Sequence, residues 1–513
     1  MISNISQYYR NYIFIILLVI LTYIHFSQVF IQHWSGVLDQ DLVIIYNSIL
    51  LNSGLDQEYR DHPGFSTFLI NSYVYKLFNI FFDYPSKIQD ILNSSNIDQI
   101  FQYYFYVSRT TNFFFNILLA IYFNKIIQKL FFDDNTIFLL TLSFIISIGF
   151  LSSFFFLRSE NLSLLFLFFS INFILSKNYN LIINFFIAGI FFALAMMAKI
   201  QIIFLALLLI YLIPNVNKGN DFKLFKNNFI KNYLLVSLVF GILTYFIFQL
   251  YIQEFERFKT NKYLDLIFFS LSLTLFYIYF YFSNNLKNNF LLFSSFLNGF
   301  IFLIMTLILL DKINLLQVND YIFLRITNPI HYMTEFTGNM ANGIISIDYL
   351  LENVFQIFSG YKFSKLELIL LLFLIFLSFR RKKNNIVLFI IFLLNSLVMN
   401  FRFNQIYYIF YSFIYLFLFT ELIKKFERKE AFKLSCVVLF LFFIDSLNFF
   451  SLKRENFIDK VLKRENAMIK ICDQINFKIV PNSYETVEYI KYWHNLLDDE
   501  KIKKICIEQS KQF

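Results

Sequence analysis

The chain has 513 residues, of which 58% are hydrophobic and 15% are charged. The charged fraction lies about 10 points below that of a typical globular protein, and apolar runs of roughly 18–20 residues recur along most of the length, which excludes an ordinary soluble domain and predicts an all-α polytopic membrane protein. A net charge of +9 could suit a nucleic-acid partner, but Lys and Arg occur in short clusters between apolar runs, where they orient membrane helices, so no nucleic-acid partner is expected.

The apolar runs are the predicted membrane helices, taken in chain order. The first, near 12–31, follows Arg10 as in a secretory signal but lacks a small-residue cleavage site, so we expect a retained anchor. The later runs lie near 64–82, 105–124, 136–157, 161–176, 182–197, 200–213, 233–252, 263–283, 289–310, 366–379, 385–400, 404–423 and 433–450. The sequence thus offers about fourteen candidate spans.

The distribution of basic residues tests whether the run 64–82 crosses the membrane. If it crosses fully, every later basic cluster faces outward, from Lys125 and Lys129 to Arg380–Lys383 and Lys424–Lys433, against the positive-inside rule. If it lies at the interface, or dips in and returns, all of these clusters become cytoplasmic. We therefore predict about thirteen transmembrane helices with the N-terminus in the cytoplasm and the C-terminus outside.

This topology also predicts the division of the chain into parts. A membrane domain covers 1–450, and a small extracytoplasmic soluble tail covers 451–513. Two long loops, 32–104 and 311–365, face outward, and the first carries helices that lie along the membrane without spanning it. The three cysteines have no metal-type spacing. Two of them, Cys472 and Cys506, could pair if the tail is outside.

Two acidic residues open the first external loop. Asp39 and Asp41 precede a helical stretch, 42–52, that ends at Gly54. Acidic residues at a helix start are favoured by the helix dipole, so both could be ordinary caps. Alternatively, one carboxylate is a base or metal ligand at the membrane surface. Because residues two positions apart point to different faces of a helix, only one of the two is expected to be catalytic.

A second charged group follows in the same loop. The stretch "YRDHPGF" places Arg60, Asp61 and His62 directly before Pro63, which suits the first turn of a new helix. A capped helix with a surface histidine is the alternative reading. Further charged residues occur at the outer ends of the predicted spans: Arg109, Arg158, Glu160, Lys199 and Arg402.

These outer-end charges can be read in two ways. Each one alone could be an anchor whose charged end reaches water along the helix. All of them point to one side of the membrane, however, and a cavity there with mixed acidic and basic groups suits a lipid-phosphate substrate. Cations hold the phosphate, and a carboxylate activates a hydroxyl or binds a divalent ion.

The order of these motifs resembles the C-type (GT-C) glycosyltransferase superfamily. The likeness is greatest to bacterial members near the protein-O-mannosyltransferases and the lipid A aminoarabinose transferases. It covers roughly residues 10–215, with a weaker likeness at 401–418. The stretches that carry it are "LDQDLVIIYNSILLNSG", "DHPGFSTFLI", "SRTTNFFFNILLAIYF", "RSENLSLLF" and "GIFFALAMMAKIQIIF". Gly64 stands where the family often has a second proline, and Glu160 stands where it often has aspartate.

The resemblance implies a GT-C fold and an activity. Such enzymes transfer a sugar, with inversion, from a polyprenyl-phosphate carrier to a lipid or glycan acceptor, here at the periplasmic face of a bacterial inner membrane, during cell-envelope glycan or lipopolysaccharide synthesis. No nucleotide cofactor is expected, and the chain has no Rossmann fingerprint or phosphate-binding glycine loop. By this resemblance the base is Asp39 or Asp41. The substrate-binding residues are Arg60, Asp61, His62, Arg109, Arg158, Lys199 and Arg402. Asp61, His62 and Glu160 are candidate ligands of a divalent cation, Mg or Mn, which some relatives do not need.

Two other functions fit a many-span chain. An outer-leaflet polysaccharide polymerase or ligase would use Arg- and His-rich late loops without the early acidic and His-Pro motifs. A lipid-linked sugar flippase or transporter would place charges deep within its spans and often shows inverted repeats. Here the charges lie at the outer ends and no repeat is evident, so the transferase is the preferred prediction.

Overall fold

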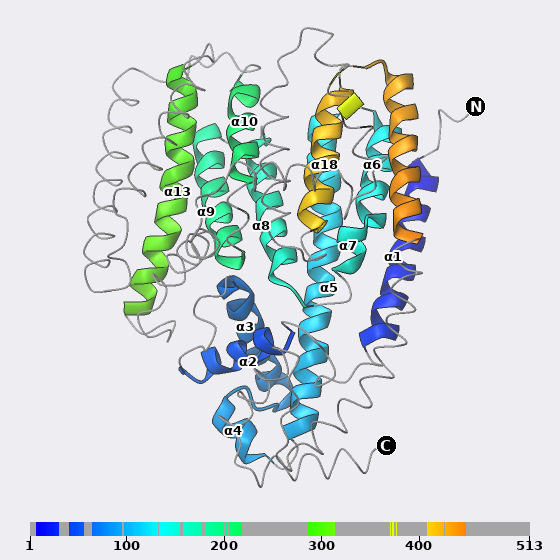
Figure 1. The fold of residues 1–513 in the computed structure, drawn as a ribbon. Coiled ribbons are helices and arrows are strands. Elements are labelled where there is room, and N and C mark those ends of the chain that lie inside the picture. The colour runs from blue at the N-terminus through cyan, green and yellow to red at the C-terminus, as the bar shows by residue number, and fades with distance from the viewer. Residues whose placement is uncertain are drawn as a thin grey trace, which may run out of the picture.

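A computed structural model describes fifteen stretches of the chain. They are residues 7–29, 41–55, 64–94, 97–131, 133–153, 157–176, 180–199, 202, 205–217, 286–312, 370, 372–373, 376, 408–424 and 426–447. Within these residues the regular structure is helical and no strand occurs. The predicted all-α class is therefore confirmed for this part of the chain (Figure 1).

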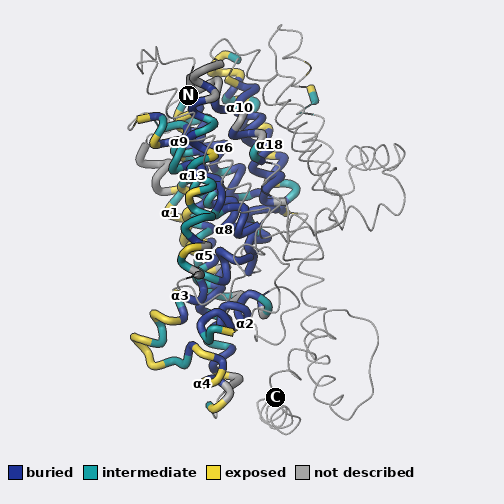
Figure 2. Tube along the Cα trace, turned by 90° about the vertical axis from the view of Figure 1, so that its left-hand side faces the viewer, coloured by how far each residue is buried: buried dark blue, intermediate teal, exposed yellow. Residues whose placement is uncertain are grey.

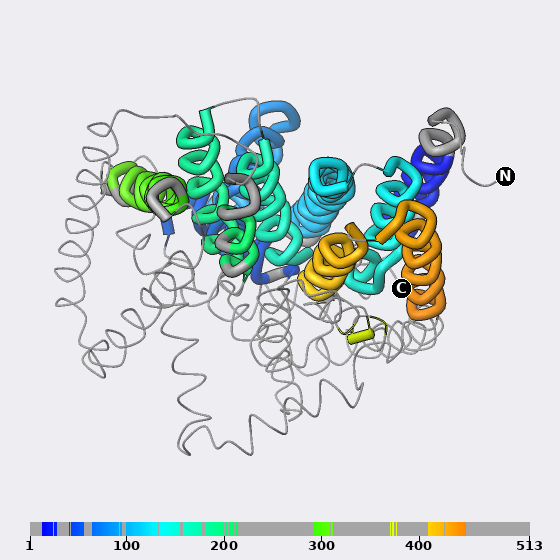
Figure 3. Tube along the Cα trace, turned by 90° about the horizontal axis from the view of Figure 1, so that it is seen from above, coloured from blue at the N-terminus to red at the C-terminus, as the bar shows by residue number. Residues whose placement is uncertain are grey.

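The long helices run side by side as a bundle. They are α1 (Gln7–Val29), α5 (Ile97–Leu130), α6 (Asp134–Ile146), α7 (Ile148–Ser152), α8 (Ser159–Ile174), α9 (Leu181–Ala198), α10 (Ala206–Asn217), α13 (Leu286–Lys312), α18 (Tyr408–Ile423) and a helix over 428–447. Viewed along the helix axes, α13 and α1 lie at opposite ends of this row (Figure 3). Two helices are long and apolar enough to cross a bilayer, the Gln99–Leu130 part of α5 and all of α9. Many of the other predicted spans fall wholly or partly outside the described residues.

Three helices lie at one end of the bundle, below it in Figure 1, and we call this the lower end. They are α2 (Asp41–Asn52), α3 (Phe65–Phe82) and α4 (Ile88–Asn93). The Ser66 hydroxyl donates to the Leu194 carbonyl of α9 at 3.1 Å, and Tyr75 hydrogen-bonds Ser108 of α5. Through these bonds α3 contacts the last turns of α9 and the first third of α5. The segment predicted not to span thus forms a helix beneath the bundle.

The length of α5 explains how the bundle and the three helices at its lower end are held together. Its 34 residues make a helix of about 51 Å, whereas the hydrocarbon core of a bilayer is about 30 Å thick. A helix of this length would extend beyond the apolar layer of a bilayer, and the lower part of α5 packs against α2, α3 and α4. At the opposite, upper end, Lys129 of α5 donates to the carbonyl and side-chain oxygen of Asn172, both at 2.7 Å.

The predicted apolar run 136–157 is not one helix. It breaks at Ser147, whose backbone is extended and whose side chain accepts from the Phe150 N–H at the start of α7. The helix α7 then ends at Ser152. A serine can bond neighbouring backbone groups and so competes with helix continuation, which is the physical reason for the break.

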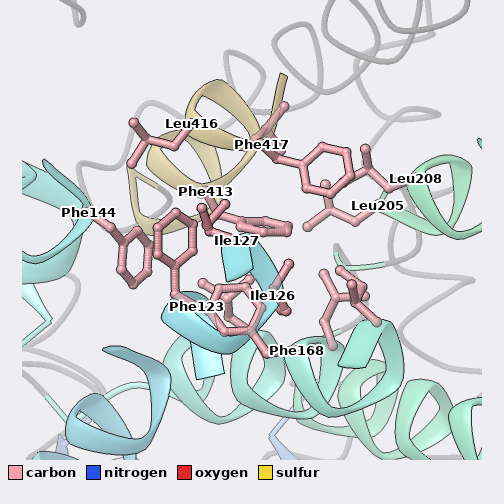
Figure 4. Close-up of a cluster of buried hydrophobic side chains, with 14 of the residues drawn as sticks. Phe123, Ile126, Ile127, Phe144, Phe168, Leu205, Leu208, Phe413, Leu416 and Phe417 are labelled. Atoms are coloured by element: carbon pink, nitrogen blue, oxygen red, sulfur yellow. The ribbon is translucent and has the colours of Figure 1, made fainter. Parts of the chain in front are cut away.

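The bundle core is aromatic and tightly packed. The Phe123 ring of α5 stacks on the Phe144 ring of α6 with centroids 4.3 Å apart (Figure 4). The Phe168 ring of α8 lies with its centroid 4.7 Å from that of Phe413 of α18. The helices α9 and α13 cross at two glycines. A Cβ atom on Gly189 would lie 1.9 Å from the Phe296 carbonyl oxygen, so only glycine permits this approach. Small residues at such crossings are typical of membrane helix pairs.

Candidate functional site

Five of the candidate site residues lie within the described chain, and the fold gathers them at the lower end. They are Asp41, Arg109, Arg158, Glu160 and Lys199, and none is more than 4% exposed. A charged anchor that reaches along a helix keeps its charged end in water. The burial of all five argues against the anchor reading for them, and the contacts described below link them to one another.

The first ion pair joins Asp41 to Arg109. Asp41 is the first residue of α2, and its Oδ2 accepts from the Arg109 Nε of α5 at 2.6 Å. Its Oδ1 accepts from the backbone N–H of Leu157 at 2.9 Å. Both carboxylate oxygens thus bond to other elements and not to the N–H groups of α2. Asp41 ties α2, α5 and the chain entering α8 together, so it is more than a helix cap.

The surroundings of Arg109 leave one of its donors without a partner. The guanidinium lies over the Phe105 ring, 4.7 Å from its centroid. Its Nη1 is buried and makes no hydrogen bond within the described part of the chain. A buried donor without a partner is unusual and points to a group that binds there.

The second ion pair joins Glu160 to Lys199. Lys199 directly follows α9, and its Nζ lies 2.8 Å from Oε1 of Glu160 in the first turn of α8. The Arg158 guanidinium, just before α8, is close enough to act electrostatically on Glu160. Two carboxylates thus face three cations, and the five residues carry one positive charge in excess.

A cluster of asparagines, not predicted from the sequence, supports this layer. The side-chain amides of Asn112, Asn116 and Asn161 donate to the Ser153 carbonyl at 3.0, 3.3 and 3.4 Å. Asn161 also donates to the side-chain oxygen of Asn112 at 3.0 Å. We call these three residues the asparagine cluster. Arg109, Asn112 and Asn116 are three and four positions apart, so they lie on one face of α5. This spacing could have been recognised in the sequence.

The first turns of α3 add neutral polar groups. Thr67 and Asn71 are buried, and Thr67 Oγ1 and Asn71 Oδ1 make no hydrogen bond within the described residues. Further along, burial raises the pKa of the Tyr75 phenol above its ordinary value, so this side chain stays neutral and serves as a hydrogen-bonding partner of Ser108.

The remaining candidates lie outside the described residues: Asp39, Arg60, Asp61, His62 and Arg402. In the described part no group of three or more His, Cys, Asp or Glu side chains could hold a metal ion. Glu160 is the only described member of the predicted metal set, and its carboxylate faces Lys199 and Arg158. The divalent-cation site, which also needs Asp61 and His62, stays a prediction.

Comparison with known proteins leaves the site to be interpreted from its own geometry. No family model matches the chain, and no curated protein and no solved structure matches it. The family resemblance therefore stays a prediction from the sequence motifs.

Proposed function

We propose that this chain is a membrane glycosyltransferase of the GT-C type. It moves a sugar from a polyprenyl-phosphate carrier to a lipid or glycan acceptor at the periplasmic face of a bacterial inner membrane. The observation that carries the proposal is the burial of Asp41, Arg109, Arg158, Glu160 and Lys199 in one layer at one end of an apolar bundle. Buried ionisable groups in such a setting are expensive and are retained mainly for function.

The orientation of the described helices supports the proposed sidedness, with the site outside and the later basic clusters in the cytoplasm. Lys129 at the end of α5 and Lys424 after α18 lie at the upper end, opposite the two ion pairs (Figure 1). With the N-terminus in the cytoplasm, the positive-inside rule then places the upper end in the cytoplasm and the site outside. The helix α3, beneath the bundle, then lies on the outer side as the charge distribution requires.

The excess positive charge of the five described residues fits the donor. A sugar linked to a polyprenyl chain through one phosphate is a phosphodiester with a single negative charge, which balances this excess. Before the donor binds, the carboxylates of Asp41 and Glu160 hold Arg109 and Lys199 in position. The phosphate then replaces these carboxylates as the partner of the two cations. The Arg109 Nη1, which has no hydrogen-bond partner within the described residues, offers the phosphate a further donor. Cations aimed at a departing phosphate stabilise the charge that develops in the transition state.

The proton of the acceptor hydroxyl passes to Asp39 or Asp41. Asp41 can serve as the base once the hydroxyl displaces Arg109 or the Leu157 N–H, because these two groups occupy both carboxylate oxygens. In the alternative, Asp39 is the base and Asp41 holds Arg109 and Leu157 in position. The acceptor oxygen attacks the anomeric carbon, the bond to the phosphate oxygen breaks, and the configuration inverts.

A transfer assay with matched variants tests this proposal. Purified protein in liposomes receives polyprenyl-phosphate sugars carrying radiolabel, and label in the acceptor is counted. Asp39→Asn separates the two base assignments, because Asp41→Asn also breaks the Arg109 pair and is expected to lose transfer under either one. Lys125→Met, a charge change at an exposed position near the far end of α5, is the control. We expect loss in Asp41→Asn, loss in Asp39→Asn only if Asp39 is the base, and normal transfer in the control. Full activity in both single aspartate variants and in their double variant would remove the base from this loop.

A further inference from the structure

Two buried polar side chains of α3 have no part in the chemistry proposed above. Thr67 and Asn71 lie in the first half of this helix, which is largely buried, whereas its second half carries exposed residues (Figure 2). Thr67 Oγ1 and Asn71 Oδ1 make no hydrogen bond within the described residues. The Asn71 amide nitrogen already donates to the Thr67 carbonyl at 2.9 Å. The atom that Asn71 leaves open is therefore an acceptor, and an open buried acceptor points to a ligand that donates.

One face of α3 directs both side chains toward α5. Thr67, Asn71 and Tyr75 follow each other at intervals of four, so they share this face. The Tyr75 hydroxyl hydrogen-bonds Ser108, which directly precedes Arg109 in α5. Thr67 and Asn71 therefore lie on the side of α3 that faces the part of α5 with the first ion pair.

The helix α3 also lies against α8 and α9. Near its start, Ser66 donates to the Leu194 carbonyl of α9 at 3.1 Å, five positions before Lys199. In α8, which α3 also contacts, Ser159 is buried next to Glu160, and its Oγ makes no hydrogen bond within the described part of the chain. Thus α3 packs against the three helices that position the ion pairs, and open polar atoms occur on both α3 and α8.

The chemistry of these open atoms selects one part of the proposed donor. The polyprenyl chain has no hydrogen-bond donor, and an ionised phosphodiester has only acceptor oxygens, which the Asn71 amide oxygen repels. The sugar has hydroxyl groups, which donate. A sugar ammonium would also donate, but the five buried charged residues already hold one positive charge in excess, and Thr67 and Asn71 supply no carboxylate to balance a second. The open atoms of α3 therefore match the hydroxyl groups of an uncharged sugar.

We propose that Thr67 and Asn71 determine donor specificity by accepting hydrogen bonds from the hydroxyl groups of an uncharged sugar. This inference rests on the proposed function, because Arg109 and Lys199 define where the carrier phosphate lies. A site that hydrogen-bonds a substrate hydroxyl discriminates strongly against an analogue without it, because the buried polar groups of the site are then left unpaired. The α3 helix thus reads the sugar while the cations hold the phosphate.

Binding of synthetic carriers to the full chain in nanodiscs tests this assignment. The probes are tritiated short-chain polyprenyl phosphodiesters of glucose, galactose, mannose and arabinose, with glucosamine as a cationic sugar. The reference is the polyprenyl methyl phosphodiester, which keeps the lipid and the single negative charge but has no hydroxyl group. The Kd of the reference divided by the Kd of a sugar probe isolates the contribution of the sugar.

We expect this ratio to be roughly tenfold or more for at least one uncharged sugar. Thr67→Val keeps the side-chain shape and removes the hydroxyl, and Asn71→Leu removes the open acceptor. Each should lower the ratio by roughly 3- to 10-fold, the effect of one net hydrogen bond. Thr67→Ser keeps the hydroxyl and should retain the ratio. The control Thr141→Val makes the same change at a buried position of α6 and should leave the ratio as in the wild type. All variants should bind the methyl reference normally.

The results separate this inference from the proposed function. If the methyl reference binds but Thr67→Val and Asn71→Leu leave the ratio unchanged, α3 does not read the sugar, and the phosphate site stands. Equal losses in Thr67→Val and Thr67→Ser, or a preference for glucosamine over every uncharged sugar, would also overturn the inference. If the wild type binds none of the carriers, the proposed function fails and this inference fails with it. Thr67→Val should keep the wild-type unfolding temperature, which distinguishes a lost contact from a misfolded protein.

Discussion

Breaking the Asp41–Arg109 pair should destabilise the fold by an amount that reflects its burial. The two groups are 2.6 Å apart and each is 1% exposed. Removing one member of a buried pair leaves an uncompensated charge and costs about 3–5 kcal/mol. Asp41→Asn and Arg109→Gln should each fall in this range. Asp41→Ala should cost about 1–3 kcal/mol more than Asp41→Asn, because the Leu157 N–H then also loses its acceptor.

The double variant distinguishes an ion pair from two independent losses. Asp41→Asn combined with Arg109→Gln removes both charges, so its cost should be smaller than the sum of the single costs by about 0.5–3 kcal/mol, the usual coupling of groups in contact. Lys125→Met is the matched control. Lys125 is an exposed side chain near the upper end of α5, so this substitution should change stability by about 0.5 kcal/mol or less.

Reversible unfolding in mixed detergent micelles, followed by circular dichroism, measures these free energies. A cost of about 3 kcal/mol changes the unfolding equilibrium by roughly two orders of magnitude and is easily resolved. Single variants that each lose less than about 1 kcal/mol, close to the Lys125 control, would refute the argument from burial. Strictly additive losses in the double variant would show that the two side chains do not interact.

Three further predictions follow from the same contacts. Asn112→Leu and Asn161→Leu should each destabilise by about 1–3 kcal/mol, since each leaves buried polar partners unsatisfied, and the same unfolding assay measures this. Gly189→Ala should destabilise the protein by about 1–3 kcal/mol or more, because the added methyl group forces α9 away from α13. The control Ile183→Ala, at a 51% exposed position of α9, should change stability by about 0.5 kcal/mol or less. Equal effects of the two substitutions would contradict the close crossing. Lys199→Met should lower kcat/KM for the sugar donor by about 10²-fold or more, and Lys199→Arg by less, in the transfer assay.

The sequence predicted where the charged residues would gather but not how they would pair. Asp41, Arg109 and Lys199 stand at the ends of apolar runs, and charge is costly inside such runs, so their common location could be read from position alone. Which acid meets which base depends on how each helix is rotated about its axis, and that is set by packing between distant segments. The link from Asp41 to the Leu157 N–H, across 116 positions of the chain, had no sequence signal.

Local chemistry likewise limited the prediction of helix boundaries. The run 136–157 is apolar throughout, so hydropathy gave one span, but the side chain of Ser147 caps a new helix and divides it. In α5 the structure extends the helix to 34 residues, beyond the predicted run 105–124, because its first turns pack on α2, α3 and α4. Hydropathy marks the apolar part of a helix and does not mark its ends.

Donor selectivity of the purified wild-type protein tests the central claim most directly. Liposomes containing the protein receive, in parallel, sugars linked to polyprenyl monophosphate and sugar or glycan units linked to polyprenyl diphosphate, with envelope lipid and glycan acceptors present. The proposal predicts covalent transfer from a monophosphate-linked donor. Products formed only from diphosphate-linked donors would indicate a polymerase or ligase, and movement of a donor across the membrane without a new glycosidic bond would indicate a flippase.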